Sequence, residues 1–399
     1  MHIIESGNVA AATGVKLSRA QVIAAYPITP QTPLTEKLSE FVESGQLDAQ
    51  YIPVESEHSA MAVCIAASTA GARAFTATSA NGLLYMVEQL HWAVGARLPV
   101  VMCVANRGIG APWTVWNDQQ DTISQRDVGW IQIYANDHQQ IIDSVIKAFK
   151  LAQTVSIPVM VCYDGYLLSH TYMPFEQPDQ KKVDAFLPAF TPKHFLDPEN
   201  PGNFNTVTLP DIRPDVDGNM APGYIEIRHN LQEDLRAALD IYVTIDKEFE
   251  KKFGRGGTPF IEEYRCDDAE FVAVSIGSLS YQLRDVIDIM RDDKVKIGVM
   301  GVQMYRPFPD QAIVQALAGK KCVIVFEKAL SYGNQGALYA DIKAALYSSA
   351  KKPSVHNYIL GLGGREIKTQ HLLDALAQSC SAPHTFGDSP RWIGLKLQE

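Results

Sequence analysis

Short, continuously apolar strands alternate with helices along most of this sequence, and that alternation limits the possible folds more than any other feature. From the start to about residue 165, apolar runs such as "QVIAAY" (21–26), "LPVVMCVAN" (98–106) and "IPVMVCYDG" (157–165) are separated by helical stretches. Strands that are apolar on both faces are typical of parallel sheets covered by helices on both sides. We therefore predict an α/β fold built on a parallel sheet with helices on both faces.

A second alternation of the same kind begins after residue 255, with apolar strands such as "EFVAVSIGS" and "KKCVIVFEK". The stretch between the two alternations is rich in proline, ends in a helical segment at 229–253, and is followed by the hinge-like "GRGG". We predict three parts. Residues 1–165 form the first domain, 166–255 a proline-rich extended excursion with a connecting helix, and 256–399 a second, smaller α/β domain.

Composition excludes several classes of function. The net charge is −10 and the basic residues form no run, so a general nucleic-acid binder is not expected. No apolar run approaches the ~20 residues that span a bilayer, and the first residues lack the pattern of a signal peptide. We expect a cytoplasmic protein that contacts neither nucleic acid nor membrane.

The six cysteines are widely spaced, and most lie inside apolar stretches. Cysteines in such positions usually act as small core residues. No pair has CxxC spacing, so we expect neither a structural zinc site nor an iron–sulfur cluster held by this chain alone.

The segment "AYPITPQTPL" (25–34) follows the first apolar strand and contains three prolines. Open parallel sheets bind ligands beyond the carboxyl ends of their strands, so a strand-end loop is a candidate site. Proline fixes its own φ and restricts the residue before it, which would hold the hydroxyl of Thr29 in place. The alternative is a rigid capping turn, with Thr32 as N-cap and Pro33 as the first residue of the next helix.

Glu57 follows the next strand, in "ESEHSAMA" (55–62), at the start of an alanine-rich helix. It could simply favour the positive end of the helix dipole, with Glu55 or Ser56 as N-cap. Alternatively, burial among small residues would raise the pKa of its carboxyl, which could then share a proton with a ligand nitrogen.

Arg107 stands where the strand "VVMCVAN" should end, and glycines at 108 and 110 break regular structure after it. An arginine in that position can hold a carboxylate through two hydrogen bonds, or it can form a surface salt bridge. The following loop is polar and aromatic, which suits contact with a ligand or with a subunit. The glycines of "SIGSLSYQL" and "LGLGG" lack the spacing of nucleotide-binding loops.

Five segments taken together resemble one family. They are "AYPITPQTP", "VESEHSAMA", "ANRGIGAPWTVWNDQQDTISQRDVGWIQIY", "VMVCYDGYLLSHTY" and "MYRPFPDQAI". Their sequence and order resemble the alpha subunit of the 2-oxoacid:ferredoxin oxidoreductases, most of all the pyruvate:ferredoxin oxidoreductase (pyruvate synthase) type. The resemblance runs over almost the whole chain.

That resemblance implies a thiamine-diphosphate pyrimidine-binding domain followed by a domain similar to the carboxyl-terminal domain of transketolase. It implies CoA-dependent oxidative decarboxylation of a 2-oxo acid, with CoA as co-substrate and electrons passing to ferredoxin. The beta subunit of the family binds the diphosphate and Mg²⁺, and gamma and delta complete a heterotetrameric assembly that carries [4Fe-4S] clusters. This chain lacks the GDG and Asn motif and the cysteine sets that those roles need.

The resemblance also implies roles for individual residues. Glu57 matches the glutamate that hydrogen-bonds N1′ of the aminopyrimidine and so makes the cofactor nucleophilic. Pro27 and Ile28 belong to the same cofactor-binding motif. Thr29 and Arg107 match the residues that contact the polar end and the carboxylate of the 2-oxo acid, and these two would orient its keto carbon.

The chain departs from the pyruvate-type pattern at "NRGIG" (106–110), where relatives tend to carry "NRAL". Gly108 beside the carboxylate clamp could enlarge the acyl pocket for phenylglyoxylate or 2-oxoisovalerate, or the loop could need φ > 0 there. Pyruvate remains the first expectation, with NAD as an alternative final acceptor. Two further alternatives are a non-oxidative thiamine-dependent decarboxylase or transketolase relative, and a noncatalytic scaffold subunit.

Overall fold

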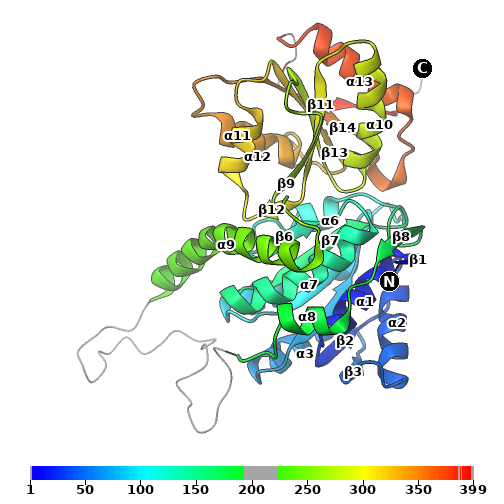
Figure 1. Cartoon of the computed structure of the whole chain (residues 1–399), viewed down its shortest axis with the longest axis vertical. Helices are drawn as coiled ribbons and strands as arrows, with labels where there is room; N and C mark the ends of the chain where they lie inside the picture. The colour runs from blue at the N-terminus through cyan, green and yellow to red at the C-terminus, as the bar shows by residue number, and fades with distance from the viewer. Residues whose placement is uncertain (1, 193–222, 385–386, 388, 397–399) are drawn as a thin grey trace.

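The computed structural model describes residues 2–192, 223–384, 387 and 389–396. Two large sheets organise these residues, one in each half of the chain (Figure 1). The first is built from β2 (Val22–Ala25), β3 (Gln50–Pro53), β4 (Ala74–Thr78), β5 (Val101–Asn106), β6 (Ile131–Tyr134), β7 (Val159–Asp164) and β12 (Met304–Arg306). Its spatial order is β12-β6-β7-β5-β4-β2-β3, and all neighbours are parallel except β12 with β6.

The second sheet contains β9 (Ile261–Tyr264), β10 (Phe271–Ile276), β11 (Ile297–Val302), β13 (Cys322–Glu327), β14 (Ser354–Ile359) and β15 (Arg391–Trp392). The order is β15-β14-β13-β10-β11-β9, and only β9 is antiparallel to its neighbour. A separate antiparallel ribbon joins β1 (His2–Ser6) to β8 (Tyr172–Glu176). The predicted α/β class with mostly parallel sheets is confirmed.

Helices cover these sheets. In the first half they are α1 (Gly7–Leu17), α2 (Thr32–Glu43), α3 (Glu57–Thr69), α4 (Ala80–Tyr85), α5 (Val87–Gly95), α6 (Gln120–Ile123), α7 (His138–Val155) and α8 (Gln180–Phe186). They are followed by α9 (Tyr224–Phe253), α10 (Leu279–Asp292), α11 (Asp310–Leu317), α12 (Ala337–Leu346) and α13 (Thr369–Ser381). Within the described residues, no helix has both the length and the apolarity that crossing a membrane requires.

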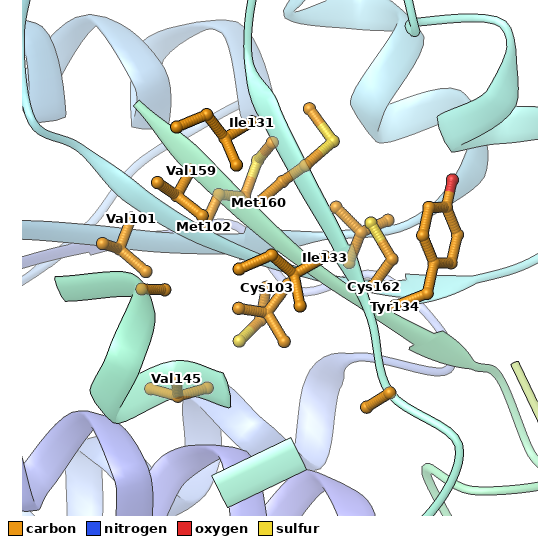
Figure 2. Packing of buried hydrophobic residues seen from close by; sticks show 14 of the residues in the cluster. Val101, Met102, Cys103, Ile131, Ile133, Tyr134, Val145, Val159, Met160 and Cys162 are labelled. Atoms are coloured by element: carbon orange, nitrogen blue, oxygen red, sulfur yellow. The ribbon is translucent and has the colours of Figure 1, made fainter. Parts of the chain in front are cut away.

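The core of the first half lies around the central strands β5, β6 and β7, whose residues are all buried. Figure 2 shows side chains of these strands packed together, with Val145 of α7 beneath them. Cys103 and Cys162 are part of this cluster. Burial raises the pKa of both thiols, so they behave as apolar core residues, as the sequence predicted.

The structure shows three features that the sequence did not predict. A break at Met86 separates α4 from α5. The helix α2 begins with Thr32 itself and its N-cap is Gln31, so the assignment of Thr32 as N-cap is wrong. The strand β12, from the second half, joins the first sheet, where Tyr305 packs edge-on against Tyr134.

Of the predicted proline-rich excursion and connecting helix (166–255), residues 193–222 lie outside the described residues. The predicted helical segment 229–253 lies within α9, which runs alongside the first sheet and contacts α7 (Figure 1).

Candidate active site

The direction of strand order reverses between β2 and β4, and the carboxyl ends of the strands at this reversal carry the predicted site residues. The strand β2 pairs with β3 on one side and with β4 on the other. A reversal of this kind opens a crevice beyond the strand ends, the usual ligand position in an open parallel sheet. The loops that follow β2, β3, β4 and β5 therefore define the candidate active site.

Side chains of α1 and β7 anchor the loop after β2 through hydrogen bonds. The carbonyl of Pro30 accepts a hydrogen bond from Asn8 Nδ2 at 2.8 Å, and Asn8 Oδ1 accepts one from the Tyr163 hydroxyl at 2.8 Å. The carbonyl of Ile28 accepts from the backbone N–H groups of Gln31 and Thr32. With these anchors, Pro27 and Thr29 are exposed at the rim of the crevice, while Ile28 is half-buried.

Glu57 is the first residue of α3, and Ser56 caps that helix by accepting from the Ser59 N–H at 3.2 Å. The glutamate is only 7% exposed. Burial raises the pKa of its carboxyl, while the glutamate's own backbone N–H and the charge of Arg107 act in the opposite direction. A carboxyl in this environment takes up a proton more readily than an exposed one, which suits proton sharing with a ligand.

Gly82, in α4, packs directly over the Glu57 carboxyl. A Cβ at this position would lie 2.5 Å from Glu57 Oε1 and 2.5 Å from Thr78 Oγ1, so only glycine allows this approach. The Thr78 hydroxyl is buried and has no hydrogen-bond partner within the described residues. The Glu57 carboxyl therefore lies beside a small residue and an unpaired hydroxyl.

Arg107, directly after β5, is 4% exposed. Its Nη1 donates to the backbone carbonyl of Thr29 at 2.6 Å, and its backbone N–H donates to Asp121 Oδ2 at 3.1 Å. Burial lowers the pKa of the guanidinium, and the charge of Asp121 partly restores it. Over the described part of the chain Nε has no hydrogen-bond partner and the guanidinium donates only to the Thr29 carbonyl, so it can still bind an anion.

The structure thus brings Thr29, Glu57 and Arg107 to one edge of the sheet. Arg107 meets Thr29 through the backbone carbonyl rather than through the side-chain hydroxyl that the sequence emphasised. Gly108 differs from expectation in another way. A Cβ there would lie 2.6 Å from Thr114 Cγ2 and 3.1 Å from Asp118 Oδ2, so the missing methyl leaves no free space, and φ at Gly108 is not positive.

Asp121 is a fully buried carboxylate that the sequence identified only as part of a polar loop. Its Oδ2 accepts from the backbone N–H groups of Ala80 and Arg107, and its Oδ1 accepts from Asn106 Nδ2 and the Thr122 N–H. Burial raises the pKa of Asp121 to about 7, against the effect of these donors. An acidic residue in a short helical turn of a polar loop gives no local signal that would predict such a set of partners.

A second buried carboxylate joins the two sheets. Asp164, at the end of β7, lies 3.2 Å from Lys328 Nζ, directly after β13, and both side chains are almost fully buried. Ser278 donates to Asp164 from its backbone N–H and its hydroxyl, and Gln119 donates from its side chain. Burial alone would raise the pKa of Asp164, but Lys328 and these donors hold it below its usual value.

The two glycine motifs also contribute to this junction. Gly277 has φ +73°, and a Cβ there would meet Gln119 and Asp164 at 2.7 and 3.0 Å. Gly364 has φ +76°, its N–H donates to the Asn117 carbonyl at 2.7 Å, and a Cβ would lie 2.4 Å from Trp116 Cβ. These glycines allow the segments that follow β10 and β14 of the second sheet to pack closely against the loop that follows Arg107.

Comparison with known proteins gives concordant matches. The family profile described as pyruvate flavodoxin/ferredoxin oxidoreductase, thiamine diphosphate-binding, matches residues 13–233, and the profile of pyruvate:ferredoxin oxidoreductase core domain II matches 269–372. The ketoisovalerate oxidoreductase subunit VorA of Pyrococcus abyssi is 44% identical over 91% of this chain and 89% of that protein. The pyruvate synthase subunit PorA of Methanothermobacter thermautotrophicus is 42% identical over 98% of this chain and 97% of that protein.

Two solved structures share the fold. A 2-oxoglutarate:ferredoxin oxidoreductase from Magnetococcus marinus, determined with 2-oxoglutarate, coenzyme A and succinyl-CoA bound, aligns with a TM-score of 0.71 at 20% identity. The alignment covers 95% of this chain and 65% of that longer one. A split-gene transketolase, an inactive beta4 tetramer, aligns with a TM-score of 0.56 at 12% identity over 94% of this chain and 98% of that one.

Proposed function

This chain belongs to the alpha subunits of the 2-oxoacid:ferredoxin oxidoreductases, and from that membership we propose its role in catalysis. The complex that contains it oxidatively decarboxylates a 2-oxo acid in the presence of CoA. The products are acyl-CoA and CO₂, and two electrons pass singly through iron–sulfur clusters on other subunits to ferredoxin. In this reaction the chain contributes the carboxylate-binding and proton-handling residues of the active site.

The observation that carries the proposal is the state of Arg107. This buried guanidinium forms no ion pair among the described residues, and the charges of Asp121 and Glu57 offset only part of the cost of its burial, so a ligand carboxylate would offset more of that cost. Its hydrogen bond to the Thr29 carbonyl fixes its direction, and the planar guanidinium suits two parallel bonds to a carboxylate. Arg107 and the exposed Thr29 would thus hold the polar end of a 2-oxo acid in one orientation.

Glu57 fits the aminopyrimidine of thiamine diphosphate. The raised pKa of its carboxyl favours a proton shared with a ring nitrogen, and the unpaired Thr78 hydroxyl adds a polar atom to the same crevice. Pro27 and Ile28, on the loop beside Glu57, would contact the ring. Bound thiamine diphosphate supplies a nucleophilic carbon and an electron sink for decarboxylation, and Glu57 controls the proton at the pyrimidine nitrogen.

Pyruvate is the proposed substrate. The space beside Gly108 is filled by Thr114 and Asp118, so this glycine does not by itself favour a larger acyl group. Similar relatives are named both as pyruvate synthase and as ketoisovalerate oxidoreductase subunits, and 2-oxoisovalerate is therefore the direct competitor.

The remaining components belong to partner subunits in this proposal. A beta subunit binds the diphosphate and Mg²⁺, and gamma and delta subunits complete a heterotetramer that carries [4Fe-4S] clusters. The relatives are themselves named as subunits, which supports an assembly of this kind. Ferredoxin is the proposed acceptor, with NAD as the alternative.

The test is to purify this chain alone and with its partner subunits, and to measure reduction of a low-potential viologen dye. We expect reduction by the assembled complex only when thiamine diphosphate, CoA and a 2-oxo acid are all present, with pyruvate preferred over 2-oxoisovalerate and phenylglyoxylate. Full activity from the isolated chain would refute its role as a subunit. An iron-free complex that decarboxylates without reducing the dye would identify a non-oxidative decarboxylase instead.

A further inference from the structure

Asp121 lies outside the set of residues that would touch substrate or cofactor, yet it contacts the backbone of the elements that carry them. One of its oxygens, Oδ2, accepts from the N–H of Arg107 at 3.1 Å and from the N–H of Ala80 at 3.0 Å. Ala80 begins α4, the helix whose Gly82 lies against the Glu57 carboxyl. A single oxygen atom therefore links the substrate side of the crevice to the cofactor side.

The backbone at Ala80 needs this support. Its φ is +42°, a left-handed conformation that is unfavourable for an alanine. The hydrogen bond to Asp121 helps to hold that conformation, and with it the position of α4 over Glu57. The second oxygen is fixed independently, because Oδ1 accepts from Asn106 Nδ2 at 2.8 Å and from the Thr122 N–H at 2.8 Å.

Asp121 also provides negative charge near Arg107 without occupying its guanidinium. It contacts the arginine through the main chain only, so among the described residues Nε remains unpaired, and Nη1 binds the Thr29 carbonyl. A carboxylate placed directly on the guanidinium would compete with a substrate carboxylate for the same donors. In its observed place, Asp121 offsets part of the cost of burying the positive charge and leaves the donors available.

We propose that Asp121 is a positioning residue of the 2-oxo acid site, which sets the place of Arg107 and of the α4 backbone over Glu57 through one shared oxygen. The inference rests on the proposed function, since it assigns Arg107 to the substrate carboxylate. It predicts that loss of the Asp121 carboxylate weakens binding of the 2-oxo acid. The cause would be the displaced Arg107 and not a general loss of folded protein.

A double-mutant cycle in the assembled complex tests this. Asp121→Asn keeps the size of the side chain, but its amide group cannot accept hydrogen bonds from both pairs of donors. We measure KM and kcat for pyruvate, with 2-oxoisovalerate in parallel, for the wild type, Asp121→Asn, Arg107→Ala and the double variant. When Arg107 is present, Asp121→Asn should raise KM roughly 10-fold. In a protein that already carries Arg107→Ala, the same substitution should change KM by no more than about 2-fold.

Asp118→Asn is the matched control. Asp118 is a buried carboxylate in the same loop, but it accepts from the N–H groups of Gln120 and Gly363 and does not contact Arg107 or Ala80. Its KM for the 2-oxo acid should stay within about 2-fold of the wild type. If Asp121→Asn does not assemble, Asp121→Ser, which retains one shorter acceptor, takes its place in the cycle.

The outcomes are distinct. An unchanged KM in Asp121→Asn, whatever its kcat, would overturn the inference, as would equal KM effects with and without Arg107. If the wild-type complex turns over no 2-oxo acid, the proposed function itself fails. If the wild type is active and Asp121→Asn matches it in KM, only the inference about Asp121 fails.

Discussion

Lys328 and Asp164 form a buried ion pair between the two sheets, with 3.2 Å between Nζ and Oδ2 and both side chains at most 2% exposed. Asp164 ends β7 of the first sheet, and Lys328 follows β13 of the second. Lys328 also donates to Asn117 Oδ1 at 3.0 Å, and its carbonyl accepts from the Gln119 N–H. The second sheet is therefore bound, through Lys328, to the loop that runs from Arg107 to Asp121.

Replacing Lys328 should destabilise the protein strongly. Lys328→Met leaves Asp164 as an uncompensated buried carboxylate, which costs about 3–5 kcal/mol. We expect this loss in the free energy of unfolding, measured by denaturant titration of the chain. Lys321→Ala, which breaks the more exposed pair with Glu270, is the control and should cost less than about 1 kcal/mol. Equal losses in the two variants would contradict the importance of the buried pair.

Stability should fall as pH rises toward neutrality, in part because of Glu327. This glutamate is buried and accepts from the N–H groups of Leu338 and Tyr339 at the start of α12, and burial raises its pKa to about 7. The pKa of Glu327 in the folded protein is higher than its value of about 4.5 in the unfolded chain. The contribution of Glu327 to the free energy of unfolding is therefore complete below pH 4.5 and is lost as the pH rises through about 7.

Glu327→Gln should make this pH dependence shallower, because glutamine stays neutral. The measurement is the melting temperature of both proteins between pH 5 and 8. The wild type should lose more stability across this interval, although Asp121, whose pKa is also raised to about 7, keeps a slope in the variant. Glu233→Gln on the exposed surface of α9 should leave the slope as it is. If the melting temperature of Glu327→Gln fell more steeply with pH than that of the wild type, the direction assigned to the effect of Glu327 would be wrong.

Gly82→Ala should impair cofactor binding specifically. The added Cβ would lie 2.5 Å from both Glu57 Oε1 and Thr78 Oγ1, so the carboxyl or α4 must move. We expect the affinity of the assembled complex for thiamine diphosphate to fall by roughly 10-fold or more, equivalent to about 1.4 kcal/mol. The control is Gly95→Ala at the end of α5, where a Cβ meets nothing within 4 Å. If Gly82→Ala bound thiamine diphosphate as tightly as the wild type, α4 would not be part of the cofactor site.

Gly108→Ala should act on packing rather than on substrate choice. Its Cβ would lie 2.6 Å from Thr114 Cγ2, whereas a Cβ on Gly110 has its nearest neighbour at 3.7 Å. We expect Gly108→Ala to lower the melting temperature more than Gly110→Ala, with the ratio of kcat/KM for pyruvate and 2-oxoisovalerate changing by less than about 3-fold. A large shift of that ratio toward pyruvate would restore Gly108 as a determinant of pocket size.

The sequence predicted the repeating strands and helices well, because apolar periodicity is a local property. It also located Thr29, Glu57 and Arg107 at strand ends, where the sheet now brings them together. The roles proposed for these residues remain predictions. The family resemblance supplied those roles, since each residue also had a plausible structural explanation.

What the sequence did not reveal depends on contacts between distant segments. The partners of Asp121 include the start of α4 and the end of β5, and Lys328 meets Asp164 across 164 positions of sequence. The strand β12 joins a sheet whose other members end at Asp164. In "LGLGG", which lacks the spacing of a nucleotide-binding loop, Gly364 allows close packing against Trp116. Periodicity and spacing carry no information about such pairings.

Substitution of Glu57 tests the central claim most directly. In the assembled complex, Glu57→Gln keeps the size of the side chain but cannot exchange a proton with the pyrimidine of thiamine diphosphate. The measurement is the rate of viologen reduction at saturating pyruvate, CoA and thiamine diphosphate. We predict a loss on the order of 10³-fold, with assembly unchanged. A rate within about 3-fold of the wild type would contradict a catalytic role for this chain and favour a noncatalytic scaffold.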